Sequence, residues 1–244
     1  IYCKVFKTKQ VKIEYNDKLE LDLDSLNKSI DKNTCLIILA NPNSPTGSLI
    51  EQKDLERIII KARKYDIKVL IDEAYYEFSK YNCLNRITKY DNLIIIRTFS
   101  KIFGLAGLRA GYVVSNQRNI KKYFSIKPMY EINSIAVKAI ELLLKKPSLI
   151  NSYLKEMRIG ENYAKAFCKN NGYKFIKCFA NFYHIDFNFN PKIIQKYLVD
   201  NKILVKGGPG VSSFENYLRI SFSNKKTTSL ILKKINNFLL KRNK

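Results

Sequence analysis

The chain has 244 residues, of which 46% are hydrophobic, so it can bury a sizeable core in one large domain or in a domain with a smaller companion. No apolar run is long enough to span a membrane, and the start lacks a signal-peptide pattern, so we expect a cytoplasmic protein with no membrane partner. The net charge is +23, but the lysines are spread along the whole chain, which argues against a nucleic-acid partner.

The five cysteines are odd in number and lack the paired spacing of a zinc or redox motif. We therefore expect neither a disulfide framework nor a metal site. Near the start, polar and apolar residues alternate over residues 11–15 and predict a strand. A short helix should follow and run to Ile30, with Asp24 or Ser25 as its cap.

The first half of the chain continues with apolar strands around an amphipathic helix. Strands are predicted at residues 34–40, 68–71, 93–96 and 109–115, and helical periodicity occupies residues 55–62. Strand, helix and strand at this spacing form a βαβ unit with a right-handed crossover. The sequence therefore predicts an α/β fold with a mostly parallel sheet.

The second half has a different pattern. Helices are predicted at residues 132–144, 149–168 and 193–199 and at the C-terminus, and strands at 173–176, 182–187, 203–205 and 218–222. Asn171 and Gly172 should close the second of these helices. This pattern predicts a smaller α+β domain, so we divide the chain into residues 1–146 and 147–244.

Each of the first three predicted strands is followed by a polar motif, at residues 44–47, 72–75 and 98–101. Parallel strands bring their carboxyl ends to one edge of the sheet, where open α/β sheets bind ligands. We therefore expect hydroxyls, a carboxylate, a phenol and an amine to converge on one crevice.

Lys101 stands between an apolar strand and a glycine-rich turn. A lysine held at such a strand end is desolvated and offers a nucleophilic amine, which suits Schiff-base chemistry with an aldehyde. Thr98, Ser100 and Arg109 supply donors for a dianionic phosphate. Pyridoxal 5'-phosphate carries both the aldehyde and the phosphate, so it is the predicted cofactor.

Two further side chains have a place in pyridoxal chemistry. Asp72, at the end of an apolar strand, can keep the pyridine nitrogen protonated, and Tyr75 can donate to the phenolate oxygen of the ring. Lys101 would then be the catalytic residue that moves the proton of the substrate α-carbon.

Four motifs together resemble the fold-type I pyridoxal-phosphate aminotransferases of class I and II, most of all the histidinol-phosphate aminotransferases. They are Asn-Pro-Asn-Ser-Pro-Thr-Gly at 41–47, Asp-Glu-Ala-Tyr at 72–75, Arg-Thr-Phe-Ser-Lys at 97–101 and Gly-Leu-Arg-Ala-Gly-Tyr at 107–112, with Ala-Asn-Phe at 180–182 and Leu-Arg-Ile-Ser at 218–221 as later landmarks. The resemblance covers essentially the whole chain. It implies an aspartate aminotransferase-like large domain, a small C-terminal domain and a homodimer.

The resemblance also implies a substrate site. Arg219 would bind the carboxylate or phosphate of the substrate through a bidentate salt bridge, and Asn181 would lie beside it. This chain has Ser44 where the family usually has an asparagine that donates to the phenolate oxygen of the cofactor. Lys206 is a further predicted substrate-binding residue: it stands where the histidinol-phosphate enzymes typically carry an arginine as a second anion contact, and it offers a point charge in place of the fork.

The family has a segment of about a hundred residues, comparable to a small domain, before the position of Ile1. The resemblance therefore implies that this chain is truncated at its N-terminus. In the family, that segment carries the loop that holds the cofactor phosphate, the aromatic residue that stacks on the pyridine ring, and contacts across the dimer interface.

The predicted function is transfer of an amino group between an amino acid such as glutamate and a small phosphorylated or carboxylated substrate. A decarboxylase of an O-phosphorylated amino acid, such as threonine phosphate, shares the same scaffold and motifs. A third hypothesis is a catalytically incompetent, truncated remnant of such an enzyme. Release of carbon dioxide separates the second hypothesis from the first, and failure to bind the cofactor would favour the third.

Overall fold

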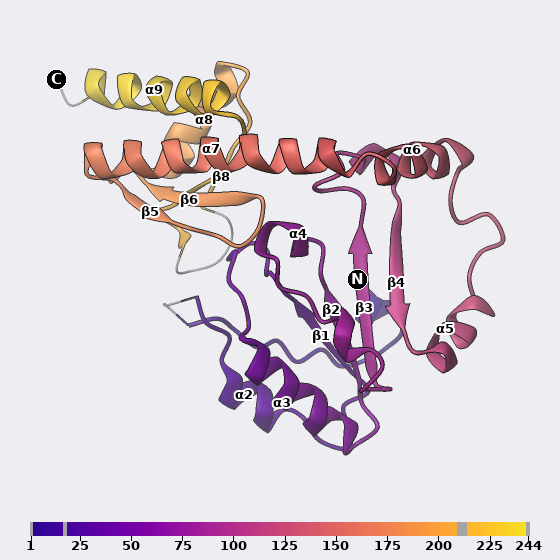
Figure 1. The fold of residues 1–244 in the computed structure, drawn as a ribbon. Helices are drawn as coiled ribbons and strands as arrows, with labels where there is room; N and C mark the ends of the chain where they lie inside the picture. Colours follow the sequence, from indigo (N-terminus) through magenta and orange to yellow (C-terminus); the bar gives the residue numbers. More distant parts are fainter. Residues whose placement is uncertain (1, 17–18, 209–213, 243–244) are drawn as a thin grey trace.

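A computed structural model describes residues 2–16, 19–208 and 214–242 of the chain (Figure 1). The first half forms a four-stranded sheet of β1 (Leu36–Ala40), β2 (Lys68–Asp72), β3 (Leu93–Thr98) and β4 (Gly111–Ser115), in that order. The first three strands run parallel, as predicted, and β4 pairs antiparallel with β3. The carboxyl end of β3 points toward the C-terminal half of the chain (Figure 1).

The helices of this half are α1 (Tyr2–Val5), α2 (Leu23–Lys28), α3 (Gln52–Arg63), α4 (Tyr76–Ser79) and α5 (Gln117–Phe124), with short 3-10 helices at η1 (Leu84–Arg86) and η2 (Ala106–Leu108). The apolar face of α3, which includes Ile58 and Ile59, is buried against β2, where Val69 and Ile71 are also fully buried. This packing confirms the helical periodicity read from the sequence, because the residues at that spacing share one face.

Two predictions for the N-terminal region were wrong. Residues 11–15 form no strand; within the described residues their pairing is limited to a single antiparallel bridge from Tyr15 to Leu21, which is too short to make a ladder. The following helix begins at Leu23, and its cap is Asp22, whose carboxylate accepts a hydrogen bond from Ser25 N at 2.9 Å. Asp22 therefore has the role that the sequence reading gave to Asp24 or Ser25.

The second half combines an antiparallel sheet with long helices. Its strands are β5 (Lys174–Ile176), β6 (Phe182–Asp186), β7 (Lys206–Gly207) and β8 (Leu218–Ser221), in the order β5-β6-β8-β7, and its helices are α6 (Ser134–Leu144), α7 (Pro147–Asn171), α8 (Pro191–Asp200) and α9 (Lys225–Arg242). Helices α7 and α9 lie side by side over this sheet (Figure 1). The sheet packs with helices α7, α8 and α9 around a second apolar core, which also includes Phe78 and Ile102 of the first half and is distinct from the core under β1 to β3. The division of the chain at residue 146 stays a prediction.

Three details of the second half differ from the prediction. Helix α7 begins at Pro147, two residues before the predicted start at residue 149, since the first turn needs no N–H from proline. The strand predicted at residues 203–205 is displaced to β7, and Leu204 is 85% exposed there. Helix α5 was not predicted. Gly172, with φ of +71°, ends α7 as expected.

We expect Gly160→Ala in α7 to destabilise the fold. A Cβ atom there would lie 1.9 Å from the carbonyl oxygen of Ser223, which is backbone and cannot rotate away. Alanine favours the helix by about 1 kcal/mol, but the steric overlap outweighs this gain, so the free energy of unfolding should fall by about 2 kcal/mol. Urea denaturation measures the change. Gly107→Ala, whose Cβ would meet open space, is the control, and equal stability of both variants would contradict the prediction.

Candidate active site

The three polar motifs of the first half begin side by side at one edge of the sheet. Ala40 of β1 pairs with Asp72 of β2, which pairs in turn with Ile96 of β3. Backbone hydrogen bonds continue past the strand ends, from Asn41 N to Asp72 O and from Glu73 N to Ile96 O, both 2.9 Å long. The parallel sheet thus brings the motifs to a common edge, as the sequence predicts.

Lys101 lies beside Tyr75 at this edge. The Nζ atom is 5.0 Å from the centre of the Tyr75 ring, and both side chains are half-buried. Within the described residues, the Lys101 amine has no ion pair and no hydrogen bond. It is therefore a primary amine held against an aromatic face and available to react.

The neighbouring strand ends supply a carboxylate and hydroxyls. The Asp72 carboxylate accepts a single hydrogen bond from the described part of the chain, from Ala74 N to Oδ1 at 3.0 Å, which leaves Oδ2 available. Thr98 Oγ1 accepts a hydrogen bond from Ser100 N at 3.0 Å, which shapes the turn before Lys101. The Ser100 hydroxyl has no partner among the residues described, so it can donate to a bound anion.

Two predicted cofactor residues lie at the surface of this edge. Ser44 is exposed and makes no side-chain hydrogen bond within the described residues. Arg109 is also exposed; it has a φ of +54°, and its Nη1 donates to Ala106 O at 3.0 Å. No contact joins Arg109 to Thr98 or Ser100 in the described part of the chain.

The predicted substrate residues lie on the C-terminal sheet. The Arg219 guanidinium is 5.0 Å from the centre of the Phe182 ring, and that ring meets Tyr75 edge-on at 6.0 Å. A series of contacts therefore runs from Lys101 through two aromatic rings to Arg219. Arg219 has no acidic partner among the described residues, which leaves its donors available for an anion.

The other two predicted substrate residues flank Arg219. Lys206 is directly opposite Arg219 in the β7–β8 pair and is exposed. Asn181 is half-buried, and its backbone carbonyl accepts a hydrogen bond from Phe222 N at 2.7 Å, next to the end of β8. Lys206 and Arg219 thus lie on adjoining strands, and Asn181 immediately precedes β6 of the same sheet.

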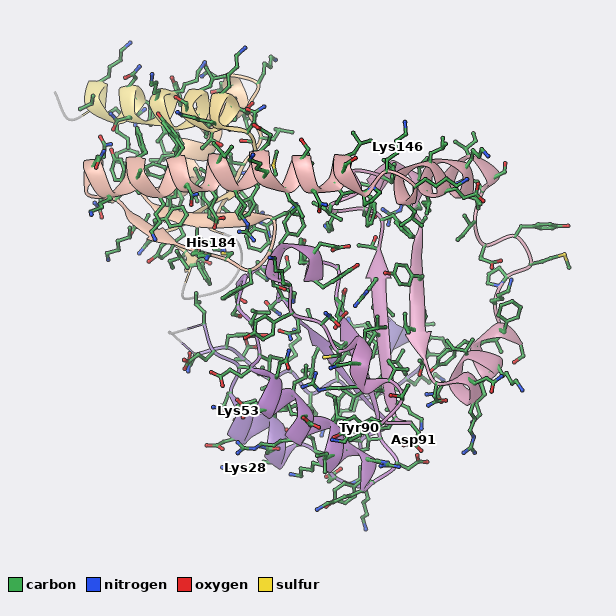
Figure 2. The ribbon with its side chains drawn as sticks, viewed as in Figure 1. Lys28, Lys53, Tyr90, Asp91, Lys146 and His184 are labelled. Atoms are coloured by element: carbon green, nitrogen blue, oxygen red, sulfur yellow. The ribbon has the colours of Figure 1, made fainter. Side chains whose placement is uncertain are left out.

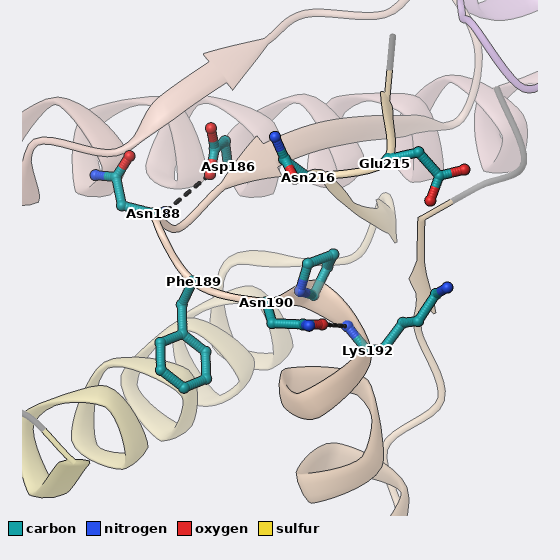
Figure 3. A pocket seen from close by; sticks show the side chains of 8 residues that line it. Asp186, Asn188, Phe189, Asn190, Lys192, Glu215 and Asn216 are labelled. Atoms are coloured by element: carbon teal, nitrogen blue, oxygen red, sulfur yellow. Dashed lines mark hydrogen bonds between the residues drawn. The ribbon is translucent and has the colours of Figure 1, made fainter. Parts of the chain in front are cut away.

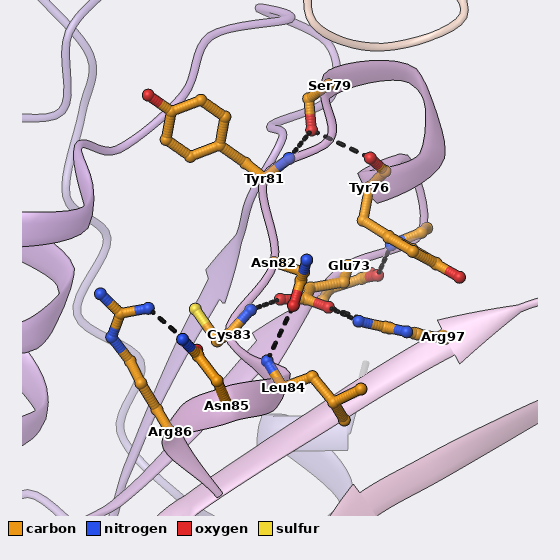
Figure 4. Close-up of polar contacts among 12 residues, drawn as sticks. Glu73, Tyr76, Ser79, Tyr81, Asn82, Cys83, Leu84, Asn85, Arg86 and Arg97 are labelled. Carbon is orange, nitrogen blue, oxygen red and sulfur yellow. Dashed lines mark hydrogen bonds and ion pairs between the residues drawn. The ribbon is translucent and has the colours of Figure 1, made fainter.

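A buried ion pair between Glu73 and Arg97, which was not predicted from the sequence, lies next to Asp72 and Thr98 at the strand ends (Figure 4). Arg97 Nε and Nη2 donate to Glu73 Oε2 at 2.9 and 2.7 Å, and Cys83 N donates to Oε1. The Arg97 guanidinium also stacks 3.6 Å from the centre of the Tyr76 ring. Burial raises the pKa of the Glu73 carboxyl, and the hydrogen bonds from Arg97 and Cys83 oppose that rise.

This ion pair joins the residue after Asp72 to the residue before Thr98, so it fixes the spacing of two of the polar motifs. Charged residues at the ends of neighbouring apolar strands were the available signal, because such charges are almost never buried without a partner.

A pocket of about 530 Å³ lies elsewhere (Figure 3). Residues on the loops around α8 and before β8 line it, Asp186, Asn190, Lys192 and Glu215 among them. None of the predicted site residues lines this pocket. The described residues contain no group of three or more His, Cys, Asp or Glu side chains placed to hold a metal, and no described helix is long and apolar enough to cross a membrane.

Solved structures share this fold. The histidinol-phosphate aminotransferase from Clostridium acetobutylicum superposes with a TM-score of 0.87 at 22% identity, covering 97% of this chain and 73% of its own. The L-threonine-O-3-phosphate decarboxylase from Porphyromonas gingivalis gives a TM-score of 0.72 at 22% identity, covering 87% and 67%. The chain therefore has the fold of the aminotransferase-like enzymes.

The sequence comparisons give the family. The model for aminotransferase class I and II matches residues 2–235. Histidinol-phosphate aminotransferase 1 of Carboxydothermus hydrogenoformans is 34% identical over 236 residues, which are 96% of this chain and 66% of that protein. The chain thus belongs to the class I and II aminotransferase family, and it spans about two thirds of the length of the curated relatives it matches.

Proposed function

We propose that the protein is a pyridoxal-phosphate-dependent aminotransferase of the histidinol-phosphate aminotransferase kind. It would transfer an amino group between an amino acid such as glutamate and a small phosphorylated or carboxylated substrate. The observation that carries the proposal is the unpaired Lys101 amine, 5.0 Å from the Tyr75 ring, at the sheet edge where Asp72 ends β2. Relatives with this name, 33 to 35% identical over nearly the whole chain, support it.

The side chains at this edge fit pyridoxal 5'-phosphate. Asp72 has an available carboxylate oxygen for the ring nitrogen, and Lys101 has an amine for the aldehyde. Ser100, with Arg109 from the surface, would supply donors for the phosphate, and Ser44 would reach the ring oxygen from the β1 side. The Thr98 hydroxyl donates to Ala110 O at 3.4 Å, so it would have to turn from that carbonyl to join them. When bound, this cofactor supplies a sink for the electrons released as a bond to the substrate α-carbon breaks.

Each residue then has a defined task. Lys101 Nζ takes the proton from the substrate α-carbon and returns it in a later step. Asp72 Oδ2 accepts a hydrogen bond that holds a proton on a ring nitrogen, and the Tyr75 hydroxyl donates to a ring oxygen. Arg219, with Lys206 and Asn181, orients the substrate through its anionic group.

An assay separates this function from its alternatives. Incubation with histidinol phosphate or another phosphorylated amine, together with 2-oxoglutarate, should form glutamate without release of carbon dioxide. Release of carbon dioxide from threonine phosphate without consumption of 2-oxoglutarate would instead establish a decarboxylase. Absence of both, together with no cofactor absorbance, would identify a catalytically incompetent remnant.

We expect Arg219→Lys to weaken substrate binding more than turnover. Lysine keeps the charge but loses the planar fork that holds both oxygens of a carboxylate or phosphate, so KM should rise about 10- to 100-fold. Steady-state kinetics with the phosphorylated substrate measure the change. Arg118→Lys, on exposed α5, is the matched control. An unchanged KM in the Arg219 variant would exclude it from substrate binding.

We also propose that the protein acts in the cytoplasm as a homodimer. Large apolar side chains are exposed from the end of α5 to the start of α6. They are Phe124, Ile126, Met129, Tyr130 and Ile135, which are 68 to 89% exposed. Contiguous apolar surface of this kind marks protein interfaces. Sedimentation velocity tests the assembly state.

A further inference from the structure

The loop that carries Ser44 is bonded to the C-terminal sheet. The ring Nε2 of His184, in β6, is 2.9 Å from the carbonyl oxygen of Pro45. Phe179 N donates to Gly47 O at 2.7 Å, and the Cys178 thiol lies 3.6 Å from Thr46 O. Figure 2 shows His184 where the C-terminal sheet faces the first half of the chain.

The geometry fixes the protonation of His184. A carbonyl oxygen only accepts, so Nε2 must donate and Nδ1 carries no proton in the neutral ring. The side chain is fully buried, with the centre of the tilted Phe214 ring 4.2 Å from the imidazole, and Nδ1 has no partner among the described residues. The charged group that faces it is Arg219, directly opposite in the β6–β8 pair.

A second proton on this ring would therefore be buried beside a guanidinium. Burial lowers the pKa of His184 to about 4, and the positive charge of Arg219 acts in the same direction, while the bond to Pro45 opposes both. The ring is then neutral and remains a hydrogen-bond donor throughout the physiological pH range.

Strand β6 connects three parts of the candidate site. His184 bonds the Ser44 loop, and Phe182, two residues earlier on the strand, contacts both Tyr75 and Arg219. The packing behind the loop is close, because a Cβ on Gly47 would lie 2.3 Å from Cys178 Cβ. A shift of β6 would therefore displace the loop and the substrate arginine together.

We propose that His184 is a positioning residue: its Nε2–H bond to Pro45 O fixes the Ser44 loop relative to the strand pair that carries Arg219. The proposal rests on the proposed function in that Ser44 and Arg219 are taken to contact cofactor and substrate. Leucine at this position would leave the Pro45 carbonyl without a partner, whereas the amide of glutamine can still donate.

The bond itself can be tested without any activity. His184 is the single histidine of the chain, so NMR of protein labelled with [15N]histidine reports on it directly, and His184→Gln assigns the signal. We expect the neutral ring with the proton on Nε2, without titration between about pH 5 and 8. A neutral ring with its proton on Nδ1 would overturn the proposal, because Nε2 could then not donate to Pro45 O.

Hydrogen exchange tests the effect on the loop, again without activity. The amide of Gly47 donates to Asn43 O at 2.9 Å within the loop. We expect this amide to exchange about tenfold faster in His184→Leu, in line with the loss of one hydrogen bond, and at nearly the original rate in His184→Gln. Ile185→Val, at the next position of β6, is the control for general loosening of the strand. Equal exchange in the Leu and Gln variants would count against the proposal.

A double-mutant cycle tests the link to the site. We expect His184→Leu to lower kcat/KM about tenfold in the original protein but less than twofold when Ser44 is already alanine, because both changes remove the same placed hydroxyl. Full additivity of the two substitutions would overturn the positioning role. If Ser44→Ala alone has no effect, the role proposed for Ser44 fails, while the NMR and exchange results still decide whether His184 holds the loop.

Discussion

Replacing Lys101 with alanine is expected to abolish amino-group transfer, with kcat reduced at least about 10⁴-fold, because the proposed function gives this one amine two tasks, attachment of the cofactor and transfer of the α-proton. The position of Lys101 explains why a neighbouring side chain cannot replace its amine. Nζ lies 5.0 Å from the Tyr75 ring at the carboxyl edge of the sheet, where Asp72 and Thr98 also end their strands. Coupled assays of glutamate formation measure the loss.

The chain offers a matched control for this variant. Lys225, in α9, lies 5.9 Å from the centre of the Tyr163 ring, so it makes the same kind of contact far from the sheet edge. We expect Lys225→Ala to retain full activity. The visible absorbance of bound cofactor should also disappear in Lys101→Ala and persist in Lys225→Ala. An active Lys101→Ala variant would exclude the proposed chemistry.

Short stretches of sequence were sufficient to predict the three parallel strands that position the candidate site. Strands β1, β2 and β3 are mostly apolar runs, which are typical of parallel sheets, although Leu36 and Ile38 of β1 are 41% and 63% exposed. The alternation at residues 11–15 was not sufficient, because a half-buried strand needs a neighbour along its length, and the pairing described there is a single bridge from Tyr15 to Leu21. The sequence pattern of a single segment does not show whether another segment will pair with it.

Contacts between the two halves of the chain could not be predicted. The His184–Pro45 bond joins residues 139 positions apart, and the Tyr75–Phe182 contact likewise crosses from the first sheet to the second. Each residue alone has an ordinary role, as a core histidine or a core aromatic. Their joint role depends on how the two sheets meet, which follows from packing rather than from any motif.

The Glu73–Arg97 pair shows a different limit of the sequence reading. Both residues lie inside quoted motifs, at 72–75 and 97–101, but no role was predicted for either of them. The predicted cofactor contacts were their neighbours Asp72 and Thr98. The Glu73 and Arg97 side chains are 1% and 7% exposed. Whether a charge at a strand end is solvated or buried depends on what covers it, and here Tyr76 does so.

We expect Glu73→Leu to lower the free energy of unfolding by about 4 kcal/mol, because it leaves the Arg97 guanidinium buried without its counter-charge. The backbone N–H of Cys83 also loses its acceptor. Urea denaturation measures the loss. Activity should fall as well, since the pair holds Asp72 and Thr98 at their relative positions.

The double variant Glu73→Leu/Arg97→Met distinguishes a lost charge pair from lost packing. Replacing both partners removes the uncompensated charge, so most of the free energy of unfolding should be restored. Activity should remain low, because the ion pair between the ends of β2 and β3 is still missing. Glu51→Leu, which breaks the exposed pair between Glu51 and Lys53, is the control and should leave stability unchanged. If the double variant is as unstable as Glu73→Leu, the cost arises from the cavity or the orphaned Cys83 amide, and the buried guanidinium is not its source.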